Sequence, residues 1–391
     1  MKVGDWQEER RDGVLRLSAR ITWEDQDRAD EMLWFAWPAN LAESVHPEPD
    51  AALVALYPLA VHSGERRLAV AGKVSSRLAD GVESAMAVVA GHSSEFQPVA
   101  LDLTYGGTTS PRSGRDAAVC LSGGVDALAA VQQNVATTSL GDRERFASAL
   151  FILGLNTFDF VGGEPSAERV TAYDAHALRL EGFAEANGMS LLRCTTNLRA
   201  LIPSFDEWEA VANTSHLAAA GHLMRPRIAT LAIGSSGRGY LAGVIPHPLI
   251  DALHATDALL VHGAQVMMTR LEKVRRLVEW PEGLAVLRVC LMIDMPKGGQ
   301  LNCGNCEKCV RTMLDLLAIG GGALTRAPFP VNDVSADLAR HAMRSSNGRA
   351  FCKDLVPLLA ARGRHDLAAA LTIHANVQPE PRQPWWRRRP R

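Results

Sequence analysis

The stretch that most constrains this fold is an apolar run that breaks at two adjacent glycines and then resumes with helical spacing, Ala117-Ala-Val-Cys-Leu-Ser-Gly-Gly-Val-Asp-Ala127. Such an order predicts a strand, a tight loop and a helix. Gly123 and Gly124 have no Cβ atoms to keep backbone N–H groups, including that of Val125, from converging on an anion at the positive end of the helix. Ser122 adds a hydroxyl donor, and Asp126 adds a carboxylate that can hold Mg²⁺ between phosphate oxygens. The loop therefore predicts a polyphosphate site.

The same loop has a second interpretation, because a Ser-Gly-Gly turn between a strand and a helix also occurs as a plain connection. Spacing alone leaves both interpretations open. No Gly-Lys-Ser/Thr follows the glycine pair, so the loop is not a Walker A sequence and a P-loop NTPase is disfavoured.

Beyond residue 112, apolar runs alternate with helical patterns. The runs predict strands at Ala117–Leu121, Ala149–Leu155, Leu191–Thr195 and Ile228–Ile233. The helical patterns lie at Asp126–Ala136, Ala167–Asn187 and Thr214–Met224, with N-caps expected at Ser166 and at Asn213 or Thr214. This alternation predicts right-handed crossovers, and hence an α/β fold with an open parallel sheet and helices on both faces.

Ligands of such sheets bind beyond the carboxyl ends of the strands. The four ends are polar or glycine-rich: Ser122–Asp126, Asn156-Thr-Phe-Asp159, Thr195-Thr-Asn-Leu-Arg199 and Gly234-Ser-Ser-Gly-Arg238. Each alone is compatible with a simple turn. Together they predict one shared site, with Asn156 and Gly234 as nucleotide-binding candidates beside the glycine loop.

Histidines and basic residues follow the fourth strand. His247, His254 and His262 fall in a segment that reads as a loop, and each is either a candidate general base or a structural histidine. The next helical pattern carries Arg270 and Lys273, which share a face at this spacing. These two cations either neutralise phosphates or are simply solvated.

Four of the seven cysteines fall in one short segment, at Cys290, Cys303, Cys306 and Cys309. The two-residue gaps let thiolates converge on one ion, with Gly304 easing the turn. Four thiolates complete a zinc coordination shell, so the metal would fold a loop and activate no water. An iron–sulfur cluster uses similar gaps and stays the alternative. The remaining cysteines, Cys120, Cys194 and Cys352, are expected to pack as small hydrophobes.

The first 112 residues read as a separate small α/β domain. Strands are predicted at Val14–Thr22, Met32–Trp37, Ala52–Ala60, Leu68–Ala71 and Val99–Leu103, and a helix at Ser76–Ala90. Trp34, Trp37 and Tyr57 are either core residues or the lining of a pocket. A nucleotide-binding domain is predicted at 113–376, including a zinc segment at 290–313 and C-terminal helices. The basic tail 377–391 is predicted to be disordered, and its arginines and tryptophans are also suited to RNA.

Charge and composition narrow the function classes. The formal net charge of −2 over 391 residues restricts any nucleic-acid binding to a local patch. No apolar stretch approaches the ~20 residues of a spanning helix, and the polar N-terminus lacks the apolar core of a signal peptide. We therefore expect a cytoplasmic protein without a membrane partner.

The loop resembles the Ser-Gly-Gly-x-Asp-Ser sequence of the N-type ATP pyrophosphatases, the PP-loop superfamily, with Ala127 in place of the final serine. Together with the Cys-x₁₂-Cys-x₂-Cys-x₂-Cys segment, it is similar to the 7-cyano-7-deazaguanine synthase family, QueC, whose PP-loop enzymes carry a four-cysteine zinc site. The resemblance spans residues 113–317 and includes Thr196–Arg199, His247-Pro248, Arg270–Lys273 and Asn302–Thr312. The appended first domain and the insertion Asn156–Val170 depart from a minimal QueC enzyme.

The resemblance implies an adenine nucleotide α-hydrolase-like fold and an ATP-dependent ligase that uses ATP, Mg²⁺ and Zn²⁺. The enzyme would adenylate a carboxylate such as 7-carboxy-7-deazaguanine, release pyrophosphate and pass the acyl group to ammonia or an amine, giving an amide or a nitrile. Ser122, Asp126, Arg270 and Lys273 are the expected catalytic residues. Three alternatives stay open: an anti-phage enzyme that attaches a deazaguanine-type group to a protein partner, a non-catalytic nucleotide-binding subunit and a tRNA-modifying enzyme. A homodimer stays open as well.

Overall fold

The computed structural model describes residues 1–92, 96–106, 115–155, 160–161, 164–202, 212–236, 248–290, 300–339, 349 and 352–375. The chain falls into two compact units, Met1–Arg288 and Val289–Arg391. The predicted boundary between residues 112 and 113 and the tail 377–391 lie outside the described residues. Within the described parts, no helix combines the length and the apolar character needed to cross a bilayer.

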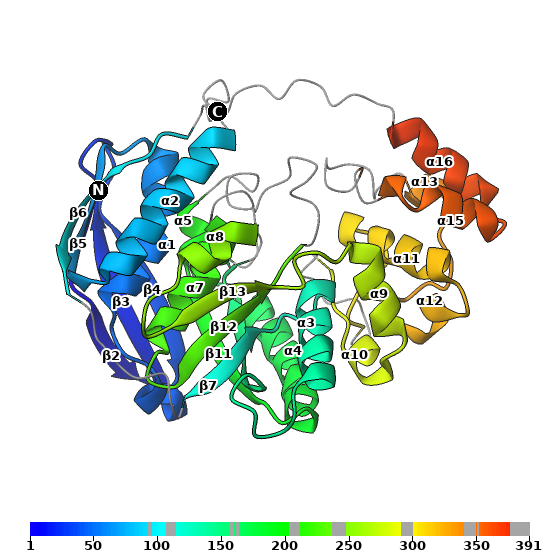
Figure 1. Ribbon diagram of the computed structural model, residues 1–391, viewed down its shortest axis with the longest axis horizontal. Helices are drawn as coiled ribbons and strands as arrows, with labels where there is room; N and C mark the ends of the chain where they lie inside the picture. The colour runs from blue at the N-terminus through cyan, green and yellow to red at the C-terminus, as the bar shows by residue number, and fades with distance from the viewer. Residues whose placement is uncertain are drawn as a thin grey trace. The chain divides into compact units, whose positions relative to one another are not determined.

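An 11-stranded, mostly parallel sheet forms the centre of the first unit (Figure 1). Five neighbouring strands are all parallel, in the spatial order β13-β12-β7-β8-β11. Their bounds are Asp116–Cys120 for β7, Phe146–Leu153 for β8, Ser190–Thr196 for β11, Ile228–Gly234 for β12 and Leu260–Ala264 for β13. The chain fills the sheet outward from β7 in one direction and then, from β12, in the other. The strand order therefore reverses between β7 and β12, which is the point where ligands bind in open α/β sheets.

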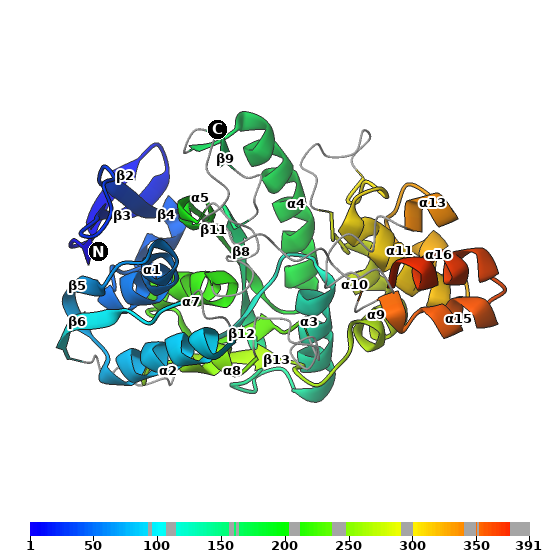
Figure 2. The same ribbon diagram turned by 90° about the horizontal axis from the view of Figure 1, so that it is seen from above.

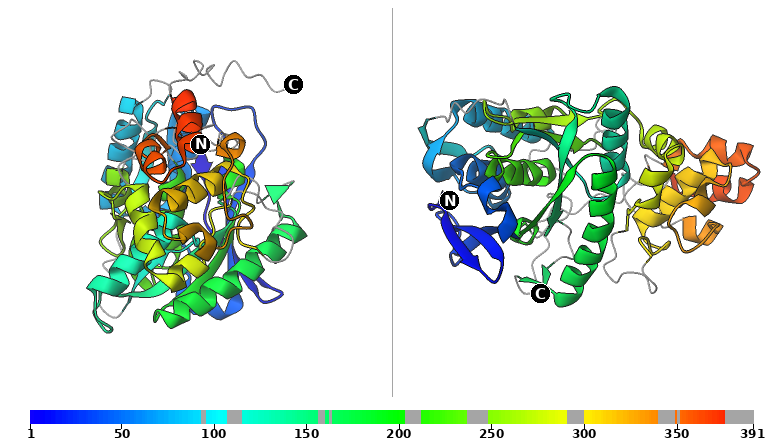
Figure 3. Two further views of the ribbon diagram at one scale, coloured as in Figure 1. Left: turned by 90° about the vertical axis from the view of Figure 1, so that its right-hand side faces the viewer. Right: turned by 90° about the horizontal axis from the view of Figure 1, so that it is seen from below.

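Helices cover both faces of this sheet, which confirms the predicted α/β class. Figure 2 shows α3 (Val125–Thr137) and α4 (Ala167–Ala186) on one face, and α7 (Asn213–Leu223) and α8 (Pro248–Leu253) on the opposite face. The long α4, green in Figure 3, runs alongside the strands. Shorter helices of this unit are α5 (Leu198–Leu201), α9 (Arg270–Val278) and α10 (Pro281–Ala285), and a small hairpin pairs β9 (Phe160–Val161) with β10 (Glu164–Pro165).

The two expected N-caps have different outcomes. Ser166 caps α4, because its Oγ accepts a hydrogen bond from the Arg169 N–H at 3.3 Å. The expected cap of α7 is wrong: the N-cap is Ala212, and Asn213 and Thr214 lie inside the helix. The Thr214 side chain instead hydrogen-bonds to the buried Asp251, which takes the hydroxyl away from the helix terminus.

Strands of the first 106 residues join the same sheet, because β4 pairs antiparallel with β11. The bounds are Lys2–Val3 for β1, Gln7–Arg11 for β2, Val14–Thr22 for β3, Glu31–Pro38 for β4, Arg67–Val74 for β5 and Ala100–Tyr105 for β6, with helices η1 (Ala39–Ser44), α1 (Pro49–Ser63) and α2 (Ser76–His92). The strand predicted at Ala52–Ala60 is wrong, since this segment lies in α1. Every residue from Asp50 to Val61 is buried, so the helix has no polar face to reveal its period in the sequence.

The segment around His262 was also assigned wrongly, as a loop. It forms β13, the edge strand next to β12, and Pro248–Leu253 forms α8. Burial settles the question about the aromatic residues of the first unit. Trp34, Trp37 and Tyr57 are 5%, 1% and 0% exposed, so all three are core residues.

The second unit carries the cysteine segment and short helices. Their bounds are Glu307–Ile319 for α11, Ala323–Arg326 for α12, Ala336–Ala339 for α13, Val356–Ala361 for α15 and His365–Ala375 for α16. The apolar side of α11, including Cys309, Met313 and Leu316, is buried.

Candidate anion site and metal centre

The glycine loop follows the carboxyl end of β7, a central strand, and enters α3 within four residues. Gly123 has a φ of 77°, a conformation that side chains other than glycine rarely adopt, and Gly124 is the N-cap of α3. Gly234, at the end of β12, packs directly on the first turn of α3: a Cβ there would lie 2.6 Å from the backbone carbonyl carbon of Asp126. The structure thus brings Gly234 to the loop through close backbone packing at the strand-order reversal, and its nucleotide-binding role stays a prediction.

Asp126 and Lys273 meet at this loop although they lie 147 residues apart in the chain. The Lys273 ammonium donates a hydrogen bond to Asp126 Oδ1 at 2.8 Å and another to the Ser235 carbonyl oxygen. The Lys273 side chain is fully buried, whereas that of Asp126 is 32% exposed. Because a buried ammonium needs a partner, this ion pair fixes one positive charge beside the loop.

Helix α9 presents both predicted cations from its buried face. A capping box at its start, in which Thr269 and Glu272 bond to each other's backbone N–H groups, sets the first turn. Arg270 is only 9% exposed, and Lys273 is fully buried. The interpretation of these two residues as solvated charges is therefore wrong, because burial holds both against the protein interior.

His176 of α4 contacts the loop, and no motif in the sequence indicates this. Its imidazole is fully buried, and its Nε2 lies 3.0 Å from the Ser122 carbonyl oxygen. Burial, followed by the positive charges of Arg288 and Arg179, lowers the pKa of His176 to about 3. Arg288 also donates its backbone N–H to the Gly123 carbonyl oxygen at 2.8 Å. A helical pattern shows which face of α4 is buried, but not which loop that face will contact.

Other predicted site residues lie elsewhere or cannot be placed. Thr196 and Asn197 are buried and bond to the backbone of β4, which makes them a link between β11 and β4. His254 is fully buried against the Tyr57 hydroxyl at 3.0 Å, so it is a core histidine and not an accessible base. His262 lies on β13, partly buried. The candidates Asn156 and His247 lie outside the described residues, as does the tail on which RNA contact depends.

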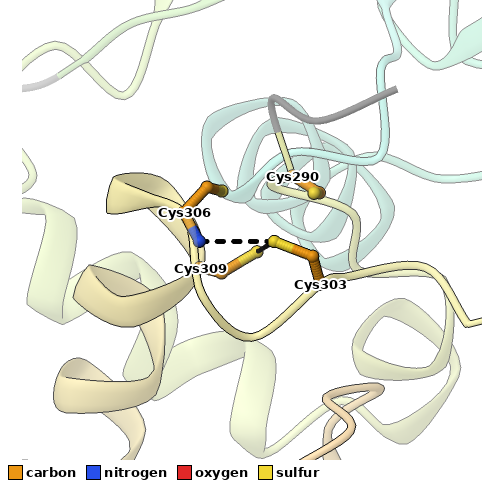
Figure 4. Close-up of side chains that lie close together, drawn as sticks. All are labelled: Cys290, Cys303, Cys306 and Cys309. Atoms are coloured by element: carbon orange, nitrogen blue, oxygen red, sulfur yellow. Dashed lines mark hydrogen bonds between the residues drawn. The ribbon is translucent and has the colours of Figure 1, made fainter. Parts of the chain in front are cut away.

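The four cysteines of the second unit converge on one point (Figure 4). Their sulfur atoms all lie within 4.8 Å of one another, and the Cys303 and Cys309 sulfurs are 3.8 Å apart. The backbone N–H groups of Asn305 and Cys306 point at the Cys303 sulfur, at 3.4 and 3.3 Å. Gly304 makes this turn possible with a φ of 69°. Such N–H groups stabilise a thiolate, so the segment is arranged to hold a cation.

Crowding of the thiols supports the same conclusion. The pKa of Cys290 is raised to about 12, first by its interaction with Cys306. The pKa of Cys309 is raised well above its ordinary value, first by Cys290 and then by Cys306. The Cys290 and Cys309 thiols therefore resist ionisation unless a cation compensates their charge, and four sulfur ligands at these separations suit a tetrahedral zinc ion.

Asn302 fixes the start of the cysteine turn. It is fully buried, its Oδ1 accepts the Val289 N–H at 2.8 Å, and its Nδ2 donates to the Pro328 carbonyl oxygen at 3.0 Å. The Cys309 sulfur lies 4.0 Å from the same Oδ1. Asn302 thus contacts both ends of the cysteine segment, at Val289 and at Cys309, and stabilises the arrangement of the four sulfurs.

Comparison with known proteins adds no relative: no family model, no curated protein and no solved structure matches this chain. The likeness to QueC enzymes stays a prediction from the motifs.

Proposed function

We propose that this protein is an ATP-dependent adenylating ligase of the PP-loop type, related to the QueC enzymes. The observation that carries the proposal is the position of the Ser122–Asp126 loop. It lies at the strand-order reversal of a parallel sheet, at the N-terminus of α3, with the buried Lys273 ammonium against Asp126. Backbone amides, a helix terminus and a fixed cation on one side of a loop favour a polyphosphate over a neutral ligand.

In the proposed reaction, a carboxylate oxygen of the substrate attacks the α-phosphorus of ATP. The bond from the α-phosphorus to the bridging oxygen of the β-phosphate breaks, and pyrophosphate leaves with that oxygen. A nitrogen nucleophile then adds to the acyl carbon and displaces AMP, which gives an amide or, after further dehydration by ATP, a nitrile. The loop amides would stabilise the charge that develops on the departing pyrophosphate.

Asp126 fits a supporting role for magnesium, because its partly exposed carboxylate adjoins the loop. Bound Mg²⁺ would neutralise phosphate oxygens, as it does in other nucleotide sites. Lys273 would keep the charge of Asp126 balanced before the nucleotide binds. Zinc at the four cysteines would hold the second unit together and take no part in the chemistry, since four sulfurs leave no coordination position for water.

A second candidate, a nucleotide-binding subunit without turnover, is favoured by one contact. Asp126 Oδ1 already receives the Lys273 ammonium, and Ala127 supplies no hydroxyl to the loop. In this case ATP would bind and no AMP would form. The attachment of a deazaguanine-type group to a protein partner remains within the first proposal, with a protein amine as the nucleophile.

Product analysis separates the two candidates. The full chain is incubated with Mg-ATP, ammonia and a panel of carboxylates that includes 7-carboxy-7-deazaguanine, and AMP and pyrophosphate are measured. The ligase proposal expects equal amounts of both products with at least one carboxylate, and loss of both in Asp126→Ala. Asp257→Ala removes an exposed carboxylate that pairs with Arg77, and it serves as the matched control. Binding of ATP with no AMP for any carboxylate would instead establish the non-catalytic subunit.

A further inference from the structure

His176 contacts the glycine loop from a side on which the ligand cannot lie. The ring sits under Gly123, whose Cβ, if present, would be 3.0 Å from Nε2. Aromatic contacts hold the ring in place: Phe151 meets it edge-on at 5.4 Å, and Phe151 stacks on Tyr173 at 4.5 Å. Tyr173 is fixed in turn, since its hydroxyl donates to the Phe151 carbonyl oxygen at 2.9 Å. His176 is therefore a rigid support built into the interface of β8 and α4.

The direction of the hydrogen bonds determines where the loop amides point. A trans peptide directs its C=O and its N–H to opposite sides. The Ser122 carbonyl points at His176, so the N–H of Gly123 points away from that ring. The Gly123 carbonyl points at the Arg288 N–H, so the N–H of Gly124 also points away from its support. Both carbonyls of the glycine turn are thus held behind the loop.

The amides of Gly123 and Gly124 face the other side as a result, and those of Val125 and Asp126 follow at the open N-terminus of α3. Gly124 N–H makes a long contact of 3.3 Å with the Ser122 hydroxyl. For the N–H groups of Gly123, Val125 and Asp126, the described part of the chain supplies no hydrogen-bond acceptor. Open amides at a left-handed glycine followed by a helix N-terminus form a concave anion receptor. A carbonyl rotated into this receptor would repel the anion.

We propose that His176 is a positioning residue, which holds the Ser122 carbonyl behind the loop and thereby presents the Gly123–Asp126 amides to a pyrophosphate group. The proposal rests on the proposed function of the same loop, but it requires only that the loop binds pyrophosphate and not that ATP is turned over. The ligand class is a diphosphate, free or as part of a nucleotide.

The protonation of the ring fits this role. Only a protonated Nε2 can donate to a carbonyl oxygen, and Nδ1 is buried without a hydrogen-bond partner in the described structure. A proton on Nδ1 would therefore leave a buried donor unsatisfied, so the neutral tautomer with Nε2–H is favoured. Burial and the nearby Arg288 and Arg179 keep the ring neutral. Their positive charge favours an anion in the same region.

Calorimetric titration of the full chain with inorganic pyrophosphate tests the proposal. His176→Met removes the Nε2–H donor and keeps a side chain of similar volume. His176→Gln keeps an N–H donor at the end of the side chain. His216→Met is the matched control, because His216 is a similarly buried histidine on α7 that hydrogen-bonds to the Ala55 backbone. Thermal unfolding of each variant measures the cost to the fold separately.

We expect His176→Met to weaken pyrophosphate binding about tenfold or more, and His176→Gln and His216→Met to stay within about threefold of the wild type. Equal binding by His176→Met and wild type would overturn the role of His176, and so would an equal loss in His176→Gln. Absence of pyrophosphate binding by the wild type would overturn it as well. If His176→Met does not fold, His176→Asn takes its place, because its shorter amide cannot reach the Ser122 carbonyl oxygen and the same loss of binding is expected. Histidine-dependent pyrophosphate binding without any AMP formation would support this proposal while refuting the ligase.

Discussion

Four fully buried histidines of the first unit make its stability strongly dependent on pH. His176, His216 and His254 have pKa values lowered to about 3, and His222 to about 4, in each case first by burial. Below the ordinary histidine pKa of about 6.5, these four histidines are protonated in the unfolded chain but stay neutral in the native state. The free energy of unfolding therefore falls as the pH falls below about 6.5, down to the lowered native values.

The buried Asp251 acts in the opposite direction. Burial raises its pKa to about 7, so the native state holds a proton between about pH 4 and 7 that the unfolded state has lost. Acidification from pH 7.5 to 5.0 lowers the free energy of unfolding by roughly 2 kcal/mol for each histidine. Protonation of Asp251 in the native state raises it by roughly 2 to 3 kcal/mol over the same range. The net loss is about 5 kcal/mol, comparable with the whole stability of many domains.

Urea unfolding between pH 5.0 and 7.5 measures this dependence. His222→Gln should remove about 2 kcal/mol of the loss in unfolding free energy between pH 7.5 and 5.0, which is the contribution of one buried histidine. His46→Asn is the control for the removal of a histidine, because the His46 side chain is 68% exposed. A wild-type free energy of unfolding that stays constant within about 1 kcal/mol over this range would contradict the lowered pKa values of the buried histidines.

Three further predictions follow from single contacts. Lys273→Met leaves the Asp126 carboxylate without its ammonium partner, so pyrophosphate binding measured by calorimetry should weaken about tenfold or more. Lys73→Met, at an exposed lysine, is the control and should bind pyrophosphate as the wild type does. Unchanged affinity in Lys273→Met would exclude a role for this charge. Gly234→Ala places a Cβ 2.6 Å from the Asp126 backbone and should lower the free energy of unfolding by about 1 to 3 kcal/mol. Gly182→Ala in α4 is the control, because a Cβ there meets nothing within 4 Å and should not destabilise the protein. Equal effects of the two substitutions would contradict close packing at Gly234. Elemental analysis should find one zinc per chain. Cys303→Ser should lose this zinc together with the helical circular-dichroism signal of the second unit. Iron with visible absorption would contradict the zinc assignment.

The sequence predicted the parallel sheet well because its strands and helices differ in period. Its failures have physical causes. Helix α1 is buried on all sides, so its sequence has no polar face and predicts a strand instead of a helix. Strand β13 is a five-residue edge strand with only one fully buried residue, too weak a pattern to recognise among histidines and glycines.

The site was only partly predictable for a different reason. Ser122–Asp126 and the cysteine cluster are local motifs, so residue type and spacing sufficed to find them. The contact of Lys273 with Asp126 depends on β13 bringing α9 to the loop, and the contact of His176 depends on the crossover through α4. Thr196 and Asn197 were assigned to the ligand side because they end a strand, whereas pairing of β11 with β4 uses their side chains inside the sheet.

Isotope exchange between pyrophosphate and ATP tests AMP transfer by itself, because it requires reversible adenylation and no nitrogen nucleophile. Labelled pyrophosphate is added to the full chain with Mg-ATP and each carboxylate in turn. We expect label in ATP only when a suitable carboxylate is present, and none in Asp126→Ala. The absence of exchange with every carboxylate, in protein that binds both ATP and pyrophosphate, would contradict the claim that this loop supports AMP transfer.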